Sequence, residues 1–488
     1  MTIDVYNPRT GTIIDSVPAH TAQQTDEAIA KARQAQLSWA ATPVEERCRI
    51  AMNIHDALLR KQRMLLDMIQ QETGKDRSSA FDEVMDAAIN ARYYAKHAGK
   101  LLRPHRKKGA LPLLTKTMVD YSPKGVVGII SPWNYPLTLT ISDAIPALLA
   151  GNVVVLKPDS QTPLTALLAR EIALEAGLPE EVYHVITGAG SVVGTALAEA
   201  VDFLMFTGST ATGRILGEIT GRRLIGFSAE LGGKNPMIIT READIAKAVR
   251  GTIAGAFSNT GQLCVSIERI YVHEDIAERY CQQLVQAVAK LRIGTGGWAE
   301  DIGSMISAEH AAKVLSLVDD ALSQGAKKLC GGPREDLGPA FLAPMVLTGV
   351  PQTAKLYREE VFGPVVAIET FSSELEAIMQ ANETEYGLNA AVFGQTKSAW
   401  RIGKQLHSGT VNINEGFAAA FGSVDAPMGG WKASGTGRRH SDVGLLKYTE
   451  ARTIAQQRLM PISGPAKLPK ASYARIMTTL LRAGKRIL

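Results

Sequence analysis

Four short, mostly apolar runs constrain the fold of this chain most, because each precedes a turn marked by glycine or proline and then a helical stretch. They are VVGII (126–130), NVVVL (152–156), VYHVI (182–186) and FLMF (203–206). Strands buried on both faces are apolar throughout, and their alternation with helices is typical of βαβ units. The pattern predicts a parallel sheet covered by helices.

A second series of the same kind begins near Pro236. Its apolar segments are MII (237–239), RIYV (269–272) and PVVAIETF (364–371), with helices expected over 244–258 and up to about Leu291. Amphipathic helices are also expected ahead of the first series, over 23–40 and 43–72. We therefore predict an α/β protein with two parallel-sheet domains.

The composition narrows the class of protein further. The chain has 488 residues, of which 45% are hydrophobic and 21% charged, and this excludes a disordered or collagen-like protein. Its four cysteines show neither CxxC nor paired spacing, so neither a disulfide framework nor a metal site is expected. Free cysteines, and a start without a basic segment followed by an apolar run, favour a cytoplasmic protein.

The positive charge is concentrated at the C-terminal end. The 53 basic and 48 acidic side chains give +5, but residues 459–488 hold six of the basic ones and no acidic one, which leaves −1 for the rest. A nearly neutral body argues against a nucleic-acid partner. The end reads as a basic amphipathic helix, which could lie on an anionic membrane or pack against a neighbouring subunit. We favour packing against a neighbouring subunit.

Three polar residues in distinctive surroundings supply the elements of carbonyl chemistry. Cys264 ends the loop NTGQLC, Glu230 precedes two glycines, and Asn134 lies between two prolines in PWNYP. Taken singly, each has an ordinary alternative as a buried thiol, a surface carboxylate or a turn asparagine. Together they form a nucleophile, a general base and an oxyanion donor.

A phosphate-binding turn is the other chemical signal. The segment around Gly188, Gly190 and Gly194 follows a strand, but its third glycine comes one residue late for the dinucleotide motif, so a plain turn is the better interpretation. The segment FTGSTATG (206–213) is the stronger candidate, because small residues there let a helix N-terminus approach a phosphate.

With these residues in view, the chain resembles an aldehyde dehydrogenase of the NAD(P)-dependent superfamily, from about residue 5 to 457. Within it, the chain is most similar to bacterial succinate-semialdehyde dehydrogenases of the actinobacterial type. The shared motifs are PWNYP (132–136), KPDSQTP (157–163), FTGSTATG (206–213), ELGGKNP (230–236), NTGQLC (259–264), EEVFGPV (359–365), GTVNIN (409–414) and PMGGWKASGTGRRH (427–440).

The resemblance implies an aldehyde dehydrogenase-like α/β fold with two Rossmann-type parallel-sheet domains and a small β element for oligomerisation, assembled as a homodimer or homotetramer. The implied division is a cofactor-binding domain (1–104 and 124–232), a catalytic domain (233–440), oligomerisation strands (105–123 and 454–460) and a basic tail (461–488).

By the same resemblance, Cys264 attacks the aldehyde to give a thiohemiacetal. The Asn134 amide and the Cys264 N–H would hold the oxyanion. Hydride transfer to the nicotinamide would leave a thioester on Cys264, and Glu230 would activate the water that hydrolyses it. Glu450 matches a carboxylate sometimes credited with a proton relay.

The cofactor is expected to contact residues from several motifs, namely Trp133, Lys157, Ser160, Gly208, Ser209, Leu231, Glu360 and Phe362. Ser160 stands where NAD-preferring members of the superfamily have a glutamate that bonds the ribose hydroxyls. Losing that carboxylate removes charge repulsion against a 2′-phosphate. We therefore expect NADP to be preferred and NAD to be the alternative, unless Asp159 turns inward.

The substrate pocket is expected to include Tyr135, Ser142, Ser258, Phe417 and Phe421. Some succinate-semialdehyde dehydrogenases have arginines at the two serine positions, and Phe417 and Phe421 lie in a mostly apolar segment. Succinate semialdehyde is the first candidate substrate, and a broad range of aliphatic or aromatic aldehydes is the alternative. A third hypothesis is a cysteine (thio)esterase that uses no cofactor, but it would leave the motif KPDSQTP without a function.

Overall fold

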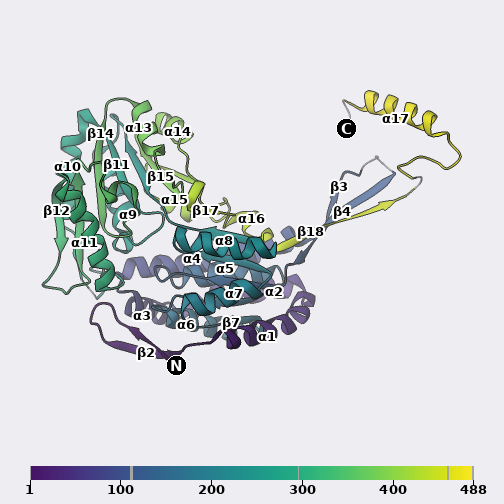
Figure 1. Ribbon diagram of the computed structural model, residues 1–488, viewed down its shortest axis with the longest axis horizontal. Helices are drawn as coiled ribbons and strands as arrows, with labels where there is room; N and C mark the ends of the chain where they lie inside the picture. The colour runs from purple at the N-terminus through teal and green to yellow at the C-terminus, as the bar shows by residue number, and fades with distance from the viewer. Residues whose placement is uncertain (1, 110–113, 295, 459–460, 486–488) are drawn as a thin grey trace.

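The computed structural model describes residues 2–109, 114–294, 296–458 and 461–485. Its two large sheets are flanked by helices, and a third, three-stranded sheet extends from the body as an arm (Figure 1). A hairpin of β1 (Thr2–Tyr6) and β2 (Ile13–Pro18) begins the chain. Within these ranges, no helix combines the length and the apolar composition that a bilayer crossing requires.

The first large sheet is formed by the four predicted apolar runs and two further strands. Its order is β17 (Gly435–Thr436), β9 (Gly226–Glu230), β8 (Phe203–Thr207), β5 (Val126–Ile130), β6 (Val153–Lys157) and β7 (Tyr183–Val185). All neighbours are parallel except β17 and β9. Every residue of β6 and β8 is buried, which is why these runs carry no polar alternation. The predicted parallel sheet is confirmed.

The helices that accompany this sheet form one hydrophobic core with it. They are α1 (Ala22–Ala41), α2 (Val44–Arg60), α3 (Gln62–Thr73), α4 (Arg77–Leu102), α5 (Thr138–Leu149), α6 (Pro163–Glu175), α7 (Thr195–Ala200) and α8 (Thr210–Arg223). The single helix predicted over 43–72 was wrong. The backbone leaves helical geometry at Lys61, which forms an ion pair with Glu175, so that α2 and α3 are separate.

The second large sheet has seven strands. Its order is β12 (Lys327–Pro333), β13 (Leu342–Thr348), β14 (Val365–Phe371), β11 (Ile267–His273), β10 (Asn235–Ile239), β15 (Asn389–Phe393) and β16 (Thr410–Ile413), and only β12 is antiparallel to its neighbour. Its helices are α9 (Ile245–Phe257), α10 (Glu274–Val288), α11 (Ala308–Ser323), α12 (Lys355–Arg358), α13 (Glu374–Asn382) and α14 (Thr396–Gly403).

The last segments of the chain return to the first sheet. After β16 come α15 (Ala418–Phe421), β17 and α16 (Ser441–Leu446). Because Gly435 pairs with Glu230, β17 becomes an edge of the first sheet although it lies inside the predicted catalytic range 233–440. The segment around 435 therefore serves both parts of the molecule, and the division into domains stays a prediction.

The arm consists of β18 (Thr449–Gln457), β4 (Thr115–Pro123) and β3 (His105–Lys107), joined as antiparallel neighbours. The last strand begins at Thr449 rather than at 454, because pairing with β4 starts there opposite Pro123. Residues 110–113, 459–460 and 486–488 of the predicted strands and tail lie outside the described residues. The tail forms α17 (Lys470–Gly484), which stands at the tip of the arm (Figure 1).

Candidate active site

The loop that carries Cys264 is held in a rare backbone conformation. Helix α9 ends at Phe257, and Asn259, Thr260 and Gly261 then follow with φ of 48°, 57° and 71°. Left-handed geometry costs a non-glycine residue about 1–2 kcal/mol. Glycine is required at 261 for a second reason, because a Cβ there would lie 2.2 Å from the Gly363 carbonyl oxygen. The strained loop fixes the position of the thiol.

Cys264, Glu230 and Asn134 line one cavity of about 120 Å³ between the two large sheets. Most of its wall is apolar and aromatic, from Tyr135, Leu139, Leu263, Val265, Phe417, Phe421 and Met428. Its charged members besides Glu230 are Asp82, Asp86 and Arg439. The three residues singled out from separate motifs thus meet in one place.

The Glu230 carboxylate ends β9 inside this cavity. It is buried, and neither of its oxygens has a hydrogen-bond partner in the described part of the chain. Burial raises its pKa to about 7, against the attraction of Arg439 and Lys447, which lowers it. A carboxylate that ionises near neutral pH and has no competing partner is suited to accept a proton.

The Cys264 thiol is protonated at neutral pH in this arrangement. Burial, together with the negative charge of Glu360, raises its pKa to about 12, while Arg439 opposes the rise. Since only a thiolate is strongly nucleophilic, the thiol must lose its proton to a base during the reaction. Glu230 is the buried base in the same cavity.

Asn134 lies in the loop between β5 and α5. Its Nδ2 donates to the carbonyl oxygen of Gln262 at 2.9 Å, two residues before the thiol. An amide nitrogen carries two hydrogens, so the second remains for an oxygen in the cavity. Within the ranges that the structure describes, no backbone carbonyl accepts a hydrogen bond from the Cys264 N–H. The site therefore offers two donors.

The residues predicted to bind the cofactor lie at the carboxyl ends of the parallel strands, the usual ligand edge of such sheets. Lys157 ends β6 and is largely buried, and its ammonium has no hydrogen-bond or ion-pair partner among the described residues; burial lowers its pKa. Ser209 caps the N-terminus of α8 by accepting from the Thr212 N–H at 3.2 Å. Beside it, a Cβ at Gly208 would meet the Phe206 ring at 2.6 Å. An unpaired ammonium and a helix N-terminus fit a phosphate-bearing cofactor.

The remaining cofactor positions lie between the two sheets. Glu360 accepts from the Gly233 N–H at 2.8 Å, and burial raises its pKa to about 8. Trp133 and Phe362 meet edge to face with ring centres 5.4 Å apart, and Leu231 packs so closely that a Cβ at Gly213 would lie 2.6 Å from it. These side chains form an apolar wall with one carboxylate.

Ser160 carries no charge where the superfamily pattern has a glutamate. Its hydroxyl donates to the Gly188 carbonyl at 3.0 Å. Asp159 accepts from the backbone N–H of Gln161 at 3.0 Å, within its own turn. The feature that favours a 2′-phosphate is therefore the missing carboxylate at 160 rather than a free hydroxyl donor.

Three predicted residues are not brought to the Cys264 cavity. Ser142 donates to Asp86 at 3.0 Å and lines only a small adjoining cavity, and Ser258 donates to the Ala254 carbonyl one turn earlier. Glu450 lies on an exposed strand and forms an ion pair with Lys124. We correct the expectation that the serines face the substrate, because both hydroxyls are used within or between helices; a relay through Glu450 has no support from its position.

The sequence analysis missed the charged groups behind the cavity wall. Arg439 and Asp143 form a buried ion pair, and Lys75 pairs with Glu83. Arg439 lies within the motif GTGRRH, but no spacing signal links it to a carboxylate 296 positions away. Among the described residues, no three His, Cys, Asp or Glu side chains are grouped as a metal site.

Comparison with known proteins shows which family shares this sequence and fold. The model of the aldehyde dehydrogenase family matches residues 1–454. A protein of Mycolicibacterium smegmatis, provisionally named succinate-semialdehyde dehydrogenase [NADP(+)], is 51% identical over 98% of this chain and 93% of its own length. The succinate-semialdehyde dehydrogenase [NADP(+)] of Escherichia coli is 38% identical over 92% of this chain and 93% of its own length.

Solved structures share the fold over nearly the whole chain. The crystal structure of an NADP-dependent enzyme from E. coli superposes with a TM-score of 0.90 at 38% identity, covering 94% of this chain and 95% of the other. That of betaine aldehyde dehydrogenase from Staphylococcus aureus, in complex with NAD+, gives 0.90 at 34% identity over 96% and 94%. The α/β fold expected from the resemblance is confirmed.

Proposed function

This chain belongs to the aldehyde dehydrogenase family, and we propose that it oxidises succinate semialdehyde to the acid with NADP+, using Cys264 as nucleophile. One observation carries the assignment of the residues. The Cys264 thiol, the unpartnered carboxylate of Glu230 and the amide of Asn134 line one cavity. This is the set that covalent oxidation of an aldehyde needs.

The first step is addition to the carbonyl. Glu230 takes the thiol proton, and Cys264 Sγ forms a bond to the carbonyl carbon as the π electrons move onto oxygen. The second Nδ2–H of Asn134 and the N–H of Cys264 stabilise that oxyanion. The strained loop at 259–261 holds sulfur and donors in a fixed relation, so little reorganisation is needed when the charge develops.

NAD(P)+, when bound, would supply the acceptor for the hydride of the former carbonyl carbon, and loss of that hydride would leave a thioester on Cys264. Lys157 and the N-terminus of α8 would hold the phosphates and ribose, and Glu360 the nicotinamide ribose. The apolar wall of Trp133, Leu231 and Phe362 would shield this part of the site from water. The preference for NADP is supported by Ser160 and by the names of the relatives.

Glu230 first releases the thiol proton to solvent and then acts as general base in hydrolysis. It takes a proton from a water molecule whose oxygen attacks the thioester carbon, and as the C–S bond breaks it passes that proton to the Cys264 sulfur. Because neither Glu230 oxygen has a partner among the residues that the structure describes, the carboxylate is free to orient toward this water.

Two observations bear on the substrate. Relatives over nearly the full length carry the succinate-semialdehyde name, which supports that substrate. Among the described residues that line the cavity, Arg439 is the one cation, and its Nε and Nη2 are bound to Asp143, so Nη1 is the donor left for a distal carboxylate. The mostly apolar wall with Phe417 and Phe421 favours the second candidate, an uncharged aliphatic or aromatic aldehyde.

The test compares initial rates of NADPH formation for the wild type and Cys264→Ala. Succinate semialdehyde, benzaldehyde and hexanal would be supplied separately with NADP+. We expect a fast signal with succinate semialdehyde that Cys264→Ala abolishes. Activity confined to the uncharged aldehydes would keep the mechanism and overturn the substrate, and activity retained in Cys264→Ala would overturn the nucleophile.

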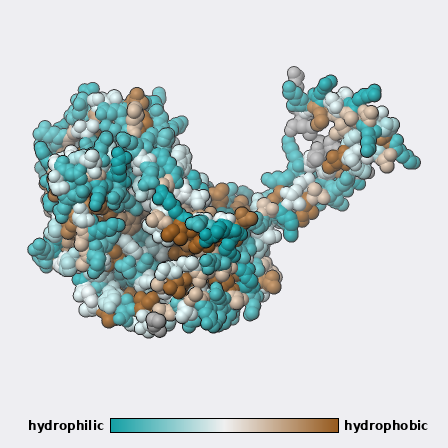
Figure 2. All heavy atoms as spheres, in the orientation of Figure 1, coloured by the Kyte–Doolittle hydropathy of each residue, from teal (hydrophilic) through white to brown (hydrophobic). Residues whose placement is uncertain are grey.

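The proposed assembly is a homodimer or homotetramer formed through the arm. Its outer strand β18 is exposed along nearly all its length, and α17 has Ile476, Leu480 and Leu481 about half exposed. Figure 2 shows hydrophobic residues between hydrophilic ones at this tip. We propose that α17 packs against a neighbouring subunit in a cytoplasmic enzyme.

Mass measurement by light scattering, with and without residues 461–488, tests this assembly. A smaller or weaker oligomer after truncation is the expected result. Co-sedimentation of the full chain with anionic vesicles would instead support the membrane alternative.

A further inference from the structure

A buried ion pair lies outside the chemistry described so far. Lys75 follows α3 and Glu83 lies in α4, and both side chains are 0% exposed, with Nζ and Oε1 2.7 Å apart. Neither residue lines the cavity. A buried ion pair often stabilises the fold no more than apolar residues of the same size. The other groups that Lys75 and Glu83 bind are therefore the place to look for their role.

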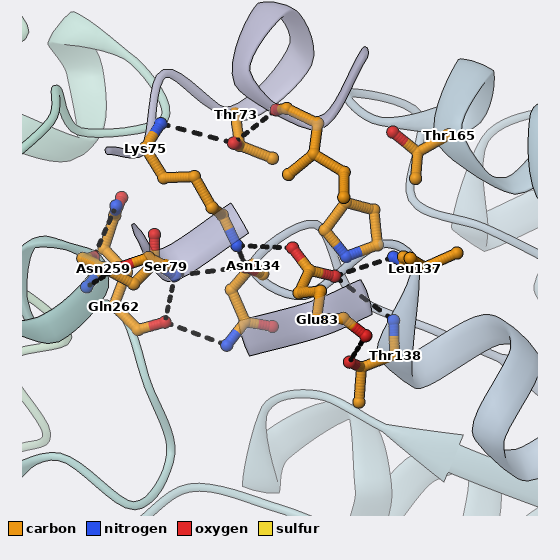
Figure 3. Close-up of polar contacts among 12 residues, drawn as sticks. Thr73, Lys75, Ser79, Glu83, Asn134, Leu137, Thr138, Thr165, Asn259 and Gln262 are labelled. Atoms are coloured by element: carbon orange, nitrogen blue, oxygen red, sulfur yellow. Dashed lines mark hydrogen bonds and ion pairs between the residues drawn. The ribbon is translucent and has the colours of Figure 1, made fainter. Parts of the chain in front are cut away.

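The pair is bonded to the loop that carries Asn134 at two points, one in its middle and one at its C-terminal end (Figure 3). Lys75 Nζ donates to the Asn134 carbonyl oxygen at 2.6 Å. The second oxygen of Glu83 accepts from the backbone N–H of Leu137 at 2.8 Å and of Thr138 at 3.2 Å, where α5 begins. One ammonium and one carboxylate thus fix the backbone on either side of the Tyr135–Pro136 segment.

The same corner of the molecule also reaches the cysteine loop. Ser79, between Lys75 and Glu83 in the chain, accepts the backbone N–H of Asn259 at 2.9 Å. The side chain of Asn259 donates in turn to the Asn134 carbonyl at 3.1 Å. The Asn134 carbonyl oxygen therefore accepts hydrogen bonds from both Lys75 and Asn259. The loop that carries Cys264 and the loop that carries Asn134 are thus both bonded to the segment from Lys75 to Glu83.

We propose that the Lys75–Glu83 pair is a positioning device that sets the Asn134 amide relative to the Cys264 sulfur. The inference rests on the proposed role of Asn134 in holding the oxyanion. Neither Lys75 nor Glu83 touches the substrate; they act through the backbone of Asn134. Because the oxyanion forms only on the way to the tetrahedral intermediate, displacement of this donor lowers kcat and leaves KM nearly unchanged.

The test is a double-mutant cycle built on Glu83→Gln, which keeps the size of the side chain, and Lys75→Met. A small misplacement of a catalytic group can cost about a hundredfold in rate. We expect each variant to lower kcat by about tenfold to a hundredfold with KM within about twofold. In an Asn134→Ala background the same substitutions should change kcat by less than about twofold, since the donor they position is gone.

A matched control is Glu72→Gln. Glu72 is another buried carboxylate that accepts the first backbone N–H groups of a helix, at Leu164 and Thr165 of α6, and it has no bond to Asn134. We expect kcat within about twofold of wild type. Thermal melting of each variant reports any loss of folding. If Lys75→Met fails to fold, the test is made with Glu83→Gln alone.

The outcomes separate this inference from the mechanism beneath it. Equal losses of kcat in the wild-type and Asn134→Ala backgrounds, or an equal loss from Glu72→Gln, would overturn the positioning role and leave the oxyanion role standing. Full activity in Asn134→Ala would overturn the oxyanion role itself, and the positioning role with it.

Discussion

Arg439 and Asp143, 296 residues apart in the chain, form a bidentate ion pair in the wall behind Glu230. The Nε–Oδ1 and Nη2–Oδ2 distances are 3.0 and 2.6 Å, and Nη2 also binds Thr207. The attraction of Arg439 lowers the pKa of Glu230 and the repulsion of Asp143 raises it. Burial sets most of the pKa of Glu230, and the balance of this pair therefore adjusts the pH at which the proposed base is available.

The pH dependence of turnover should follow Glu230. Its pKa is raised to about 7, and only the deprotonated form can take a proton from water, so activity is low below that value and rises through it. We expect the rate of thioester hydrolysis to reach half its maximum near pH 7. A pH profile of single-turnover hydrolysis measures this. A profile that is flat across neutrality would contradict the assignment, and Glu230→Gln should be slow at every pH.

The charges of the ion pair should move this midpoint in opposite directions. Asp143→Asn leaves the Arg439 cation uncompensated and should lower the pKa of Glu230, whereas Arg439→Gln should raise it, each by about one pH unit. The same single-turnover profile reports both shifts. Both variants leave a buried charge unpaired and will melt earlier. Shifts of the same sign would show that the pair does not act on Glu230 by its charge.

Cofactor preference should depend on charge at position 160. Ser160→Glu places a carboxylate where it would repel a 2′-phosphate, and we expect kcat/KM for NADP+ to fall at least about tenfold, or about 1.4 kcal/mol, with NAD+ little affected. Ser160→Ala is the control, because it removes the hydrogen bond to Gly188 without adding charge. Steady-state rates with both cofactors measure the effect. An unchanged NADP+ value in Ser160→Glu would place the 2′-phosphate elsewhere.

The cysteine loop should tolerate no side chain at position 261. Gly261 and Gly11 share a φ of 71°, but a Cβ at Gly11 meets nothing within 4 Å, whereas one at Gly261 would lie 2.2 Å from the Gly363 carbonyl oxygen. Gly11→Ala should cost only the left-handed strain, about 1–2 kcal/mol, and keep full activity. Gly261→Ala should melt lower still and lose activity. Equal melting temperatures would refute the steric argument.

Four of the six strands of the first sheet, β5 to β8, could be predicted from sequence, because a strand buried on both faces leaves a run such as VVVL that few other structures require. Cys264, Glu230 and Asn134 could be named only in combination and through a family resemblance. Taken singly, each type has a commoner structural use.

Side-chain direction and long-range pairing could not be predicted. Ser142 lies on the same helix as the cavity residue Thr138, but one turn further along, where it is bonded to Asp86. Helical periodicity predicts which face of a helix a residue shares, but not which turn of that face reaches the cavity. The Lys75 contact with the Asn134 carbonyl and the Arg439 contact with Asp143 join segments far apart in sequence. Their partners emerge only from tertiary packing.

The late position of strand β17 in the sequence predicts the effect of truncating the chain. Asn134, Glu230 and Cys264 all precede residue 265, yet the wall that encloses them is completed by Met428 and Arg439, and β9 gains its edge partner only at Gly435. A premature stop codon between positions 265 and 439 would therefore yield a polypeptide that contains every proposed catalytic residue and still has an open, unsealed site. Nonsense alleles that stop translation before position 439 should therefore be null.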